Sequence, residues 1–263
     1  MKLLTTSTVL ASCLMSTMNV YAITVDEVIT KANHAAYYQA NSGRAQVNMM
    51  ITDKAGRKNK RRFTILRKDA DQDSDGNQKF YILFHKPADV KNTTFMVWKH
   101  LSKADDRWLY LPALDLVKRI AASDNRTSFV GSHFYYEDVS GRGLKADNHQ
   151  LLKDEKLRYV VKSIPKKPAT VEFAYYVTQI DKNTFLPLKT QYFDNKGKEI
   201  RAFEALKVEK IDGYNMVTHS VMKDKISGGS TQMKYRKIQF NNPLPEQIFT
   251  ERSLRKTPTK YLK

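Results

Sequence analysis

The spacing of hydrophobic residues changes once along this chain. Near the N-terminus they recur every three or four positions, which is the spacing of one face of a helix. Thr24 and Glu27 form a capping-box pattern at the start of this stretch, where each side chain satisfies a free backbone amide. We therefore predict a helix that begins after Thr24 and stops at Gly43. The residues on its hydrophobic face are Val25, Val28, Ile29, Ala32 and Ala36.

From residue 44 onwards, apolar and polar residues alternate, as in half-buried β-strands. Turns rich in Gly, Asn and Asp separate these runs, as in the Asp-Asn-Lys-Gly sequence at 194–197. Even spacing of this kind predicts an antiparallel meander that curls into a sandwich or a barrel. Strands are expected at residues 44–52, 57–67, 79–85, 93–100, 107–111, 116–121, 157–164, 171–180, 186–193, 199–208, 215–224 and 231–240.

Residues 123–154 interrupt the alternating pattern. They are rich in Gly, Ser and charged residues, and the stretch is too long for a simple hairpin loop. We expect it to hold a short helix and a functional loop. No internal repeat and no shift in composition divides the rest of the chain, so residues 23–263 are expected to form a single domain.

The first residues have the pattern of a Sec-type secretory signal peptide over residues 1–22. Lys2 precedes an uncharged, mostly apolar stretch, and Val20 and Ala22 place small residues where a signal peptidase cuts. The stretch is too polar and too short for a membrane span. A second reading is a lipoprotein box at 10–13 with a lipid-anchored Cys13, which we favour less because the segment before it is short and polar. The expected location is the periplasm.

The chain is strongly basic. It has 45 Lys and Arg residues against 27 Asp and Glu, a formal net charge of +18. In a cytosolic protein this excess would indicate nucleic acid, but export removes that partner. The anionic partners that remain are a membrane surface or an acidic protein face. Lysines that protect strand edges from pairing explain the charge equally well.

A basic run at residues 57–62 carries its charges within a predicted strand. The side chains therefore project on both faces, which a strand in the middle of a core could not accommodate. We expect the tip of a hairpin arm or an edge. A docking arm for anionic lipid or an acidic partner and simple edge protection both stay open.

The sequence gives no support for catalysis, so we expect a protein that is not an enzyme and has no cofactor. It contains neither a G-x-S-x-G elbow nor an H-E-x-x-H motif, and its six His are scattered. Ser132 and His133 are adjacent, but adjacent side chains on an extended chain point apart. The single cysteine, Cys13, lies in the predicted signal, which leaves no thiol in the exported chain.

An acidic turn imitates the first half of a calcium loop. Asp71, Asp73 and Asp75 occupy the first, third and fifth positions, and Gly76 stands where the loop must turn. The twelfth position, which needs a bidentate Glu, is Ile82. We therefore expect no metal there and read the segment as a solvated hairpin tip, with a weak calcium site as the alternative.

One segment carries a specific motif. It contains Arg-Trp-Leu-Tyr-Leu-Pro at 107–112, a basic strand at 117–120 and Gly-Ser-His-Phe-Tyr-Tyr-Glu-Asp at 131–138. In these residues the chain resembles the periplasmic LolA-like family of outer-membrane lipoprotein-sorting proteins. The resemblance implies an incomplete antiparallel barrel, closed on its open side by helices, around an apolar cavity that holds acyl chains.

We therefore expect a mainly β fold with few helices: a single curled antiparallel sheet forming a half-open barrel, closed by the N-terminal helix and by the inserted loop and helix as a lid. Aromatic residues and Met on shared strand faces are candidates for the cavity wall, with an ordinary filled core as the alternative. The fourteen tyrosines, each with a polar tip, favour a partly solvated cavity. The candidate lining residues are Met96, Trp98, Trp108, Tyr110, Phe129, Phe134, Tyr136, Phe173 and Tyr175.

Charged residues near the motif are candidates for pinning the lid over the cavity mouth or for docking. Pairing between them would matter if buried and would contribute little at the surface. They are Arg107, Arg119, Arg126, Glu137 and Asp138.

The leading functional hypothesis is a monomeric periplasmic carrier that binds acyl chains of a lipoprotein or another lipid for transfer towards the outer membrane. The resemblance also implies an inner-membrane transporter and an outer-membrane acceptor as partners. An envelope sensor, or an accessory binding protein of an inner-membrane transporter of the resistance-nodulation-division type, is the alternative. A structural envelope protein would follow if the lumen were filled.

Overall fold

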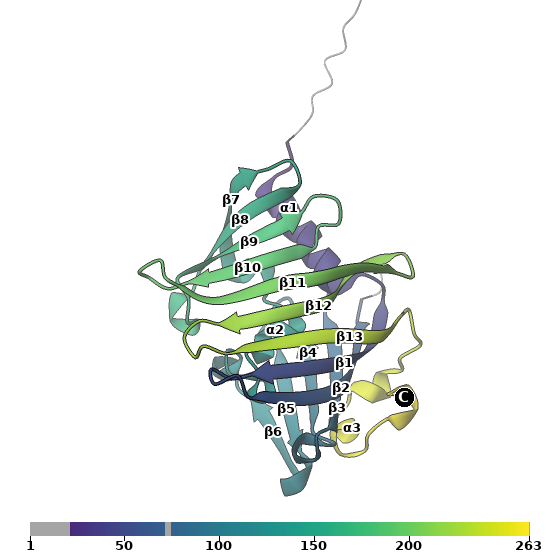
Figure 1. The fold of residues 1–263 in the computed structure, drawn as a ribbon. Coiled ribbons are helices and arrows are strands. Elements are labelled where there is room, and N and C mark those ends of the chain that lie inside the picture. Colours follow the sequence, from purple (N-terminus) through teal and green to yellow (C-terminus); the bar gives the residue numbers. More distant parts are fainter. Residues whose placement is uncertain (1–21, 72–74, 263) are drawn as a thin grey trace, which may run out of the picture.

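The computed structural model describes residues 22–71 and 75–262. Residues 1–21 of the predicted signal peptide, with Cys13, lie outside the described residues, as does Asp73. In the described part of the chain, strands β1 to β13 form one antiparallel sheet (Figure 1). The strands are β1 Ser42–Thr52, β2 Lys58–Asp69, β3 Gln78–Lys86, β4 Thr94–Lys99, β5 Asp106–Leu111, β6 Leu116–Ile120, β7 Asp147–Asp154, β8 Arg158–Pro165, β9 Tyr175–Asp181, β10 Pro187–Phe193, β11 Glu199–Ile211, β12 Tyr214–Asp224 and β13 Ser230–Phe240.

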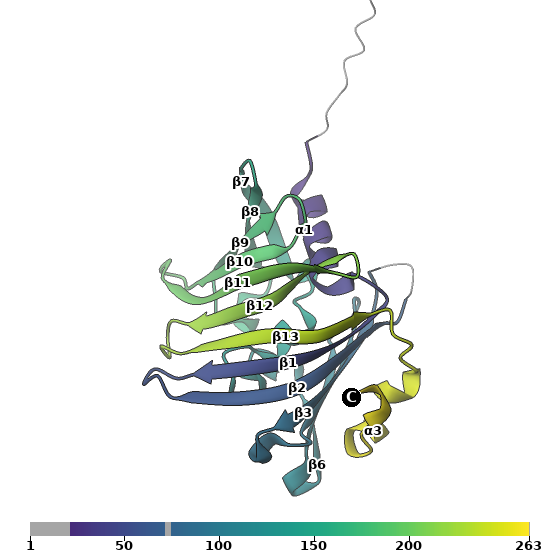
Figure 2. The ribbon, with the colours of Figure 1, turned by 45° about the vertical axis from the view of Figure 1, so that its right-hand side comes forward.

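The sheet consists of two meanders joined where the first strand pairs with the last. Its order is β6-β5-β4-β3-β2-β1-β13-β12-β11-β10-β9-β8-β7. Thr52 at the end of β1 stands opposite Ser230 at the start of β13. Strands β6 and β7 form the two edges, so the sheet curls without closing into a barrel (Figures 1 and 2). The predicted half-open barrel is confirmed.

The N-terminal helix α1, Val25–Asn33, starts as predicted. The Thr24 hydroxyl accepts a hydrogen bond from the Glu27 backbone N–H at 3.2 Å, and the Glu27 carboxylate accepts one from the Thr24 N–H at 2.8 Å. The helix continues as a π-helical turn, His34–Tyr38. The predicted stop at Gly43 is wrong, because Gly43 lies in β1. The chain leaves the helix earlier, where half-buried Arg67 donates hydrogen bonds to the free carbonyl groups of Tyr37 and Gln39.

The insertion contains more regular structure than its composition indicates. It holds the short helix α2, Tyr136–Ser140, as expected, but residues 147–154 form strand β7, which was not predicted. This strand is polar because it is an edge with one partner, β8, and most of its side chains are exposed. Single turns of 3-10 helix complete the chain at Ala88–Val90, Pro112–Leu114, Ala122–Asp124, Phe129–Gly131, Leu144–Ala146, Pro168–Thr170, Glu246–Phe249 and Thr259–Tyr261.

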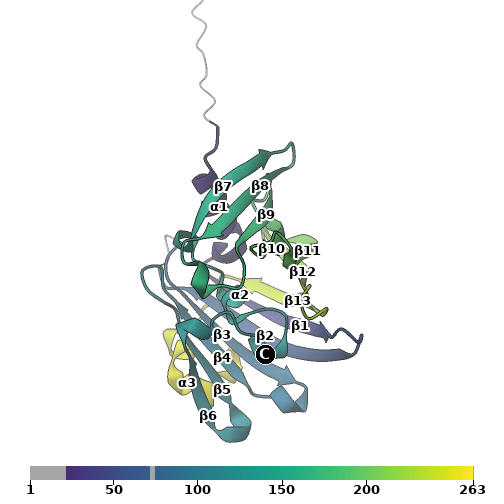
Figure 3. The ribbon, with the colours of Figure 1, turned by 90° about the vertical axis from the view of Figure 1, so that its left-hand side faces the viewer.

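The two faces of the sheet have different covers. Helix α1 and the insertion with α2 lie on the inner, concave face, whereas the C-terminal segment with α3, Glu251–Arg255, packs outside β3 to β5 (Figure 3). The C-terminal segment is tied to the outer face by side chains of the sheet. The Tyr81 hydroxyl donates to the Ser253 carbonyl at 2.7 Å, and the Trp98 indole donates to the Phe249 carbonyl at 2.9 Å. This cover was not predicted from the sequence.

Candidate functional site

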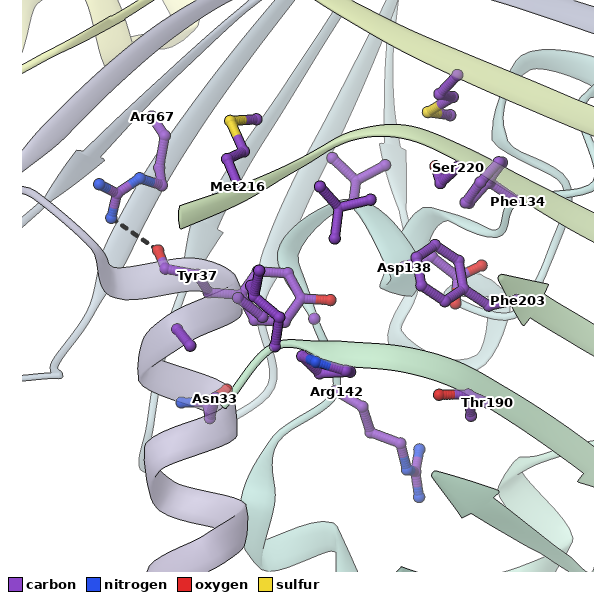
Figure 4. A pocket seen from close by; sticks show the side chains of 18 of the residues that line it. Asn33, Tyr37, Arg67, Phe134, Asp138, Arg142, Thr190, Phe203, Met216 and Ser220 are labelled. Carbon is purple, nitrogen blue, oxygen red and sulfur yellow. Dashed lines mark hydrogen bonds between the residues drawn. The ribbon is translucent and has the colours of Figure 1, made fainter. Parts of the chain in front are cut away.

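A cavity of about 410 Å3 lies between α1 and the inner face of the sheet (Figure 4). The helix and the π-helical turn that continues it contribute a wall of small side chains, including Ala32, Ala35 and Ala36. Small residues leave the space that larger ones would fill, because the sheet holds the helix at a fixed distance. The sheet and the insertion contribute mainly large apolar side chains. They include Phe63, Ile65, Phe80, Ile82, Phe129, Phe134, Val139, Phe203, Met216, Met222, Met233 and Phe240.

The inner face is hollow only in part. Below the insertion, aromatic rings fill the space between the sheet and α2. The Phe63 and Phe84 ring centroids are 5.0 Å apart, and Phe95 is 5.0 Å from Tyr136, which are distances of packed rings. The cavity therefore begins where the alanines of α1 and of the π-helical turn after it replace the aromatic cover supplied by the insertion.

Four tyrosines line the cavity wall. Tyr37 reaches in from the end of the helical segment (Figure 4), whereas Tyr176, Tyr192 and Tyr235 come from the sheet. Burial raises the pKa of Tyr192 to about 12 and that of Tyr235 to about 12, so each phenol stays protonated and can donate a hydrogen bond. Tyr37 packs against Gly141, where a Cβ atom would lie 2.7 Å from the ring and φ is +79°.

Buried ion pairs hold the insertion against the cavity. Arg126, whose side chain is 9% exposed, donates to the Glu137 carboxylate at 2.8 Å and to Glu172 at 3.0 Å. Arg201 on β11 pairs with Asp138 at the start of α2 and donates to the His133 carbonyl at 3.1 Å. Because both arginines come from outside α2, they fix the helix to two separate parts of the fold.

A third arginine extends this network. The Arg142 guanidinium donates to Asp147 at 2.9 Å and to Glu137 at 3.2 Å. Asp147 also accepts a hydrogen bond from the Tyr176 hydroxyl at 2.8 Å. Strand β7, which begins at Asp147, is thus tied to the insertion that precedes it.

Electrostatics favour the charged forms in this network. Burial alone would raise the pKa of Asp138, but Arg201 and Arg126 outweigh it and hold that pKa below its usual range. The carboxylate is therefore charged at neutral pH. It also accepts the backbone N–H of Tyr135 at 2.7 Å, which caps α2.

Lys99 is a buried cation without a carboxylate bonded to it in the described residues. Its side chain is covered, and Nζ donates to the Ser140 carbonyl at the end of α2 at 2.6 Å. The ammonium group also lies 5.1 Å from the centre of the Tyr37 ring. Burial lowers the pKa of Lys99 to about 8, because the charged form has lost its water.

Two of the nine candidate lining residues, Phe129 and Phe134, line the cavity. Tyr136 belongs to the filled aromatic core beside it, and Phe173 and Tyr175 lie at the start of β9 against Tyr176, Tyr192 and Phe193. The other four have their side chains on the outer face, under the C-terminal segment. They are Met96, Trp98, Trp108 and Tyr110.

The candidate charges also divide into two groups. Arg126 and Asp138 line the cavity, and Glu137 pairs with Arg126. Arg107 does not line the cavity, but it pairs with Asp105 at 2.6 Å and donates to the Ser140 hydroxyl of α2 at 3.4 Å. Arg119 pairs with Asp106 and does not line the cavity either. Sequence reasoning missed Arg142, Arg201 and Tyr192. Arg201 could have been found from the sequence, because it is a charged residue between two apolar ones, Ile200 and Ala202, in a predicted strand.

The described residues offer no metal centre, since no group of three His, Cys, Asp or Glu side chains among them could hold an ion. In the acidic turn, Asp75 bonds the His34 ring at 2.8 Å and Asp71 accepts the Asn77 N–H at 3.2 Å. Within the same residues, no helix is long and apolar enough to span a membrane.

The fold and the cavity together define a class: an open, curled antiparallel sheet with a helix-covered apolar cavity. Solved structures share the fold. An outer membrane lipoprotein-sorting protein domain, so described, from Vibrio parahaemolyticus is 27% identical, with a TM-score of 0.78 over 87% of this chain and 97% of that one. A DUF1329 family protein from Desulfovibrio piger is 26% identical, with a TM-score of 0.76 over 88% and 94%.

A LolA superfamily protein from Nitrosomonas europaea has the same fold, with a TM-score of 0.68 over 88% of this chain and 99% of that one, at 18% identity. A family model described as an uncharacterized protein matches residues 76–256, more than half of the chain. No curated protein matches the sequence. The chain belongs to the family that this model describes, and it is similar to LolA superfamily and lipoprotein-sorting structures, as its motif predicted.

Proposed function

We propose that this protein is a non-enzymatic carrier that binds one acyl chain of a lipid or lipoprotein in the cavity under α1. The observation that carries the proposal is the cavity itself, about 410 Å3 with mostly apolar walls, in the range of ligand pockets. At about 30 Å3 for each small group, it has room for on the order of a dozen carbon-sized groups. Methionine side chains suit a flexible hydrocarbon, because they adapt their shape.

The tyrosine hydroxyls indicate that the ligand is an amphiphile. Tyr37 and Tyr192 line the cavity, and neither hydroxyl forms a hydrogen bond with another described residue. A carbonyl or hydroxyl group of an acyl lipid would satisfy them, whereas a pure hydrocarbon would leave them unpaired. The proposed ligand therefore combines an apolar tail with a hydrogen-bond acceptor.

The proposal places the carrier in the periplasm, with residues 1–22 as its export signal and residues 23–263 as one domain. Each buried methylene contributes about 0.8 kcal/mol, so a ten-carbon tail supplies roughly 8 kcal/mol before the costs of association. Affinity of that order lets the ligand travel with the protein through water. Delivery towards the outer membrane then requires an acceptor that competes for the tail.

Titration with a fluorescent fatty acid tests the proposal. The wild-type chain should bind with saturation at one site, and Ala36→Trp, which fills the cavity from the π-helical turn after α1, should abolish binding. Thr30→Trp is the matched control, because Thr30 lies on the exposed face of the same helix. Equal binding by wild type and Ala36→Trp, or no saturable binding by wild type, would contradict acyl carriage in this cavity.

A further inference from the structure

Three neighbouring hairpins end in turns built on the same plan. The turns begin at Asp53, Asp194 and Asp224. In each, the Asp carboxylate accepts two backbone N–H groups of its own turn at 2.8–3.0 Å, and a glycine with φ of +76° to +79° follows three or four residues later. The three Asp carboxylates are therefore hydrogen-bonded within their own turns, and the side chains that project into solvent are mainly cationic.

Sheet topology places these three turns side by side. Thr52 pairs with Ser230, which sets the turn after β1 next to the turn before β13. Arg201 pairs with Asp224, which sets the turn before β11 next to the same one. Figure 1 shows the three tips along one rim of the sheet. With strands about 4.8 Å apart, the six strands involved make a rim roughly 24 Å wide.

The rim carries exposed basic side chains on every tip. Lys54, Lys58, Lys60, Lys196 and Lys198 form no ion pair with any described residue. Arg57 pairs with Asp53, and Lys225 lies 4.0 Å from Glu199. The opposite ends of these strands carry charges of both signs: Asp71, Asp75 and Asp212 lie there, as does Lys210. The exposed cations of the rim are Lys54, Arg57, Lys58, Lys60, Lys196, Lys198 and Lys225.

Edge protection does not explain this rim. Lysines guard a sheet when they lie along a free edge strand. The edges here are β6 and β7, whereas the rim is formed by the ends of β2, β1, β13, β12, β11 and β10, each of which has partners on both sides. The charges at these ends are therefore available for another role.

We propose that this basic rim docks the protein on an anionic membrane surface. The middle tip exposes Ile226, whose surface is 74% accessible, directly after Lys225. An apolar side chain among lysines is typical of a surface that enters the headgroup region, where lysine attracts anionic lipid and the apolar group is buried. Six of the seven exposed cations are lysines, which suit the diffuse charge of a membrane better than the bidentate recognition that arginine provides.

Vesicle co-sedimentation of the exported chain tests this inference. Vesicles of phosphatidylcholine with 30% phosphatidylglycerol, roughly the order used for anionic surfaces, should bind the protein, and pure phosphatidylcholine should not. The variant Lys54→Gln/Lys58→Gln/Lys60→Gln should lose about 100-fold in affinity, from three surface lysines. Ile226→Ser should weaken binding several-fold, and added salt should release the protein.

The matched control is Lys156→Gln/Lys210→Gln/Lys237→Gln, which removes three exposed lysines away from the rim and lowers the net charge equally. It should lose no more than a few-fold in affinity. An equal loss in both triple variants would overturn the proposal, because net charge alone would then explain binding. Failure to bind vesicles, together with rim-dependent binding of soluble polyglutamate, would instead assign the rim to an acidic protein. The rim contains no cavity residue, so fatty-acid binding can succeed or fail independently.

Discussion

Both faces of the sheet carry aromatic residues, but their covers differ. On the outer face, large side chains of the C-terminal segment fill the space above Tyr81 and Trp108. On the inner face, the cover changes from aromatic rings of the insertion to alanines of α1 and of the π-helical turn after it, and a cavity of about 410 Å3 appears. The covering outer residues are Leu244, Ile248, Phe249, Leu254 and Leu262. The size of the covering side chains, more than the aromatic content of the strands, decides whether a sheet face holds a ligand.

The two faces also differ in what attaches their covers. Buried arginine–carboxylate pairs fix the insertion on the inner side, whereas apolar contacts, a few hydrogen bonds and more exposed ion pairs hold the C-terminal segment outside. Asp138→Asn should therefore destabilise the protein by about 3–5 kcal/mol, because it leaves Arg201 buried without its carboxylate. Urea unfolding measures this loss.

The control for that substitution is Asp115→Asn, which removes the partner of exposed Arg255. It should change the free energy of unfolding by less than about 1 kcal/mol. Equal losses at the two sites would mean that the insertion does not depend on buried pairing.

Truncating one side chain on each face separates a filled space from a hollow one. Leu254→Ala removes a fully buried side chain from the outer cover and should cost about 2–5 kcal/mol of stability. Met216→Ala enlarges a space that already exists and should cost less than about 1 kcal/mol, while it changes fatty-acid affinity. A larger cost at Met216, measured by thermal or urea unfolding, would indicate a packed inner face.

Buried Lys99, which bonds the end of α2, should make the stability of the protein depend on pH. Its folded pKa is about 8, below the ordinary 10.5, so between these values the unfolded chain binds more protons than the folded one. Stability should therefore rise with pH, by about 2 kcal/mol from pH 8 to pH 10. Lys99→Met should flatten this slope in urea unfolding at several pH values. An unchanged slope in that variant would assign the pH dependence to another group.

The smallest expected effect is on fatty-acid affinity, and it compares one tyrosine hydroxyl on each face of the sheet. Tyr192→Phe removes a donor from the cavity wall and should weaken binding of a fatty acid about fivefold, the contribution of one hydrogen bond. Tyr110→Phe, on the outer face, should leave affinity unchanged. Competition against the fluorescent fatty acid measures both, and equal affinity of Tyr192→Phe and wild type would remove this hydroxyl from the site.

Local patterns predicted the elements well, because they depend on neighbours in sequence. The capping box at Thr24 marked the start of α1, and alternation located twelve of the thirteen strands. Strand β7 was not predicted, because an edge strand with exposed side chains needs no hydrophobic alternation. The expected strand at 171–180 begins only at Tyr175.

The site was harder to predict, since it depends on contacts between distant segments. Alternation places Met96 and Trp98 on one face but does not say which face, and a one-residue shift exchanges the two. In the structure both side chains lie on the outer face, where the C-terminal segment covers them. Arg201 and Asp138 are 63 positions apart in the chain, so no local pattern joins them.

Native mass spectrometry of the exported protein, purified from cell envelopes without detergent, tests acyl carriage most directly. The account predicts a bound species that adds the mass of a single acyl-bearing molecule, is released by organic solvent, and is missing from Ala36→Trp but present in Thr30→Trp. A wild-type spectrum with only the bare chain, joined by an equal absence of fatty-acid uptake in solution, would show that the space beneath α1 is not a lipid site.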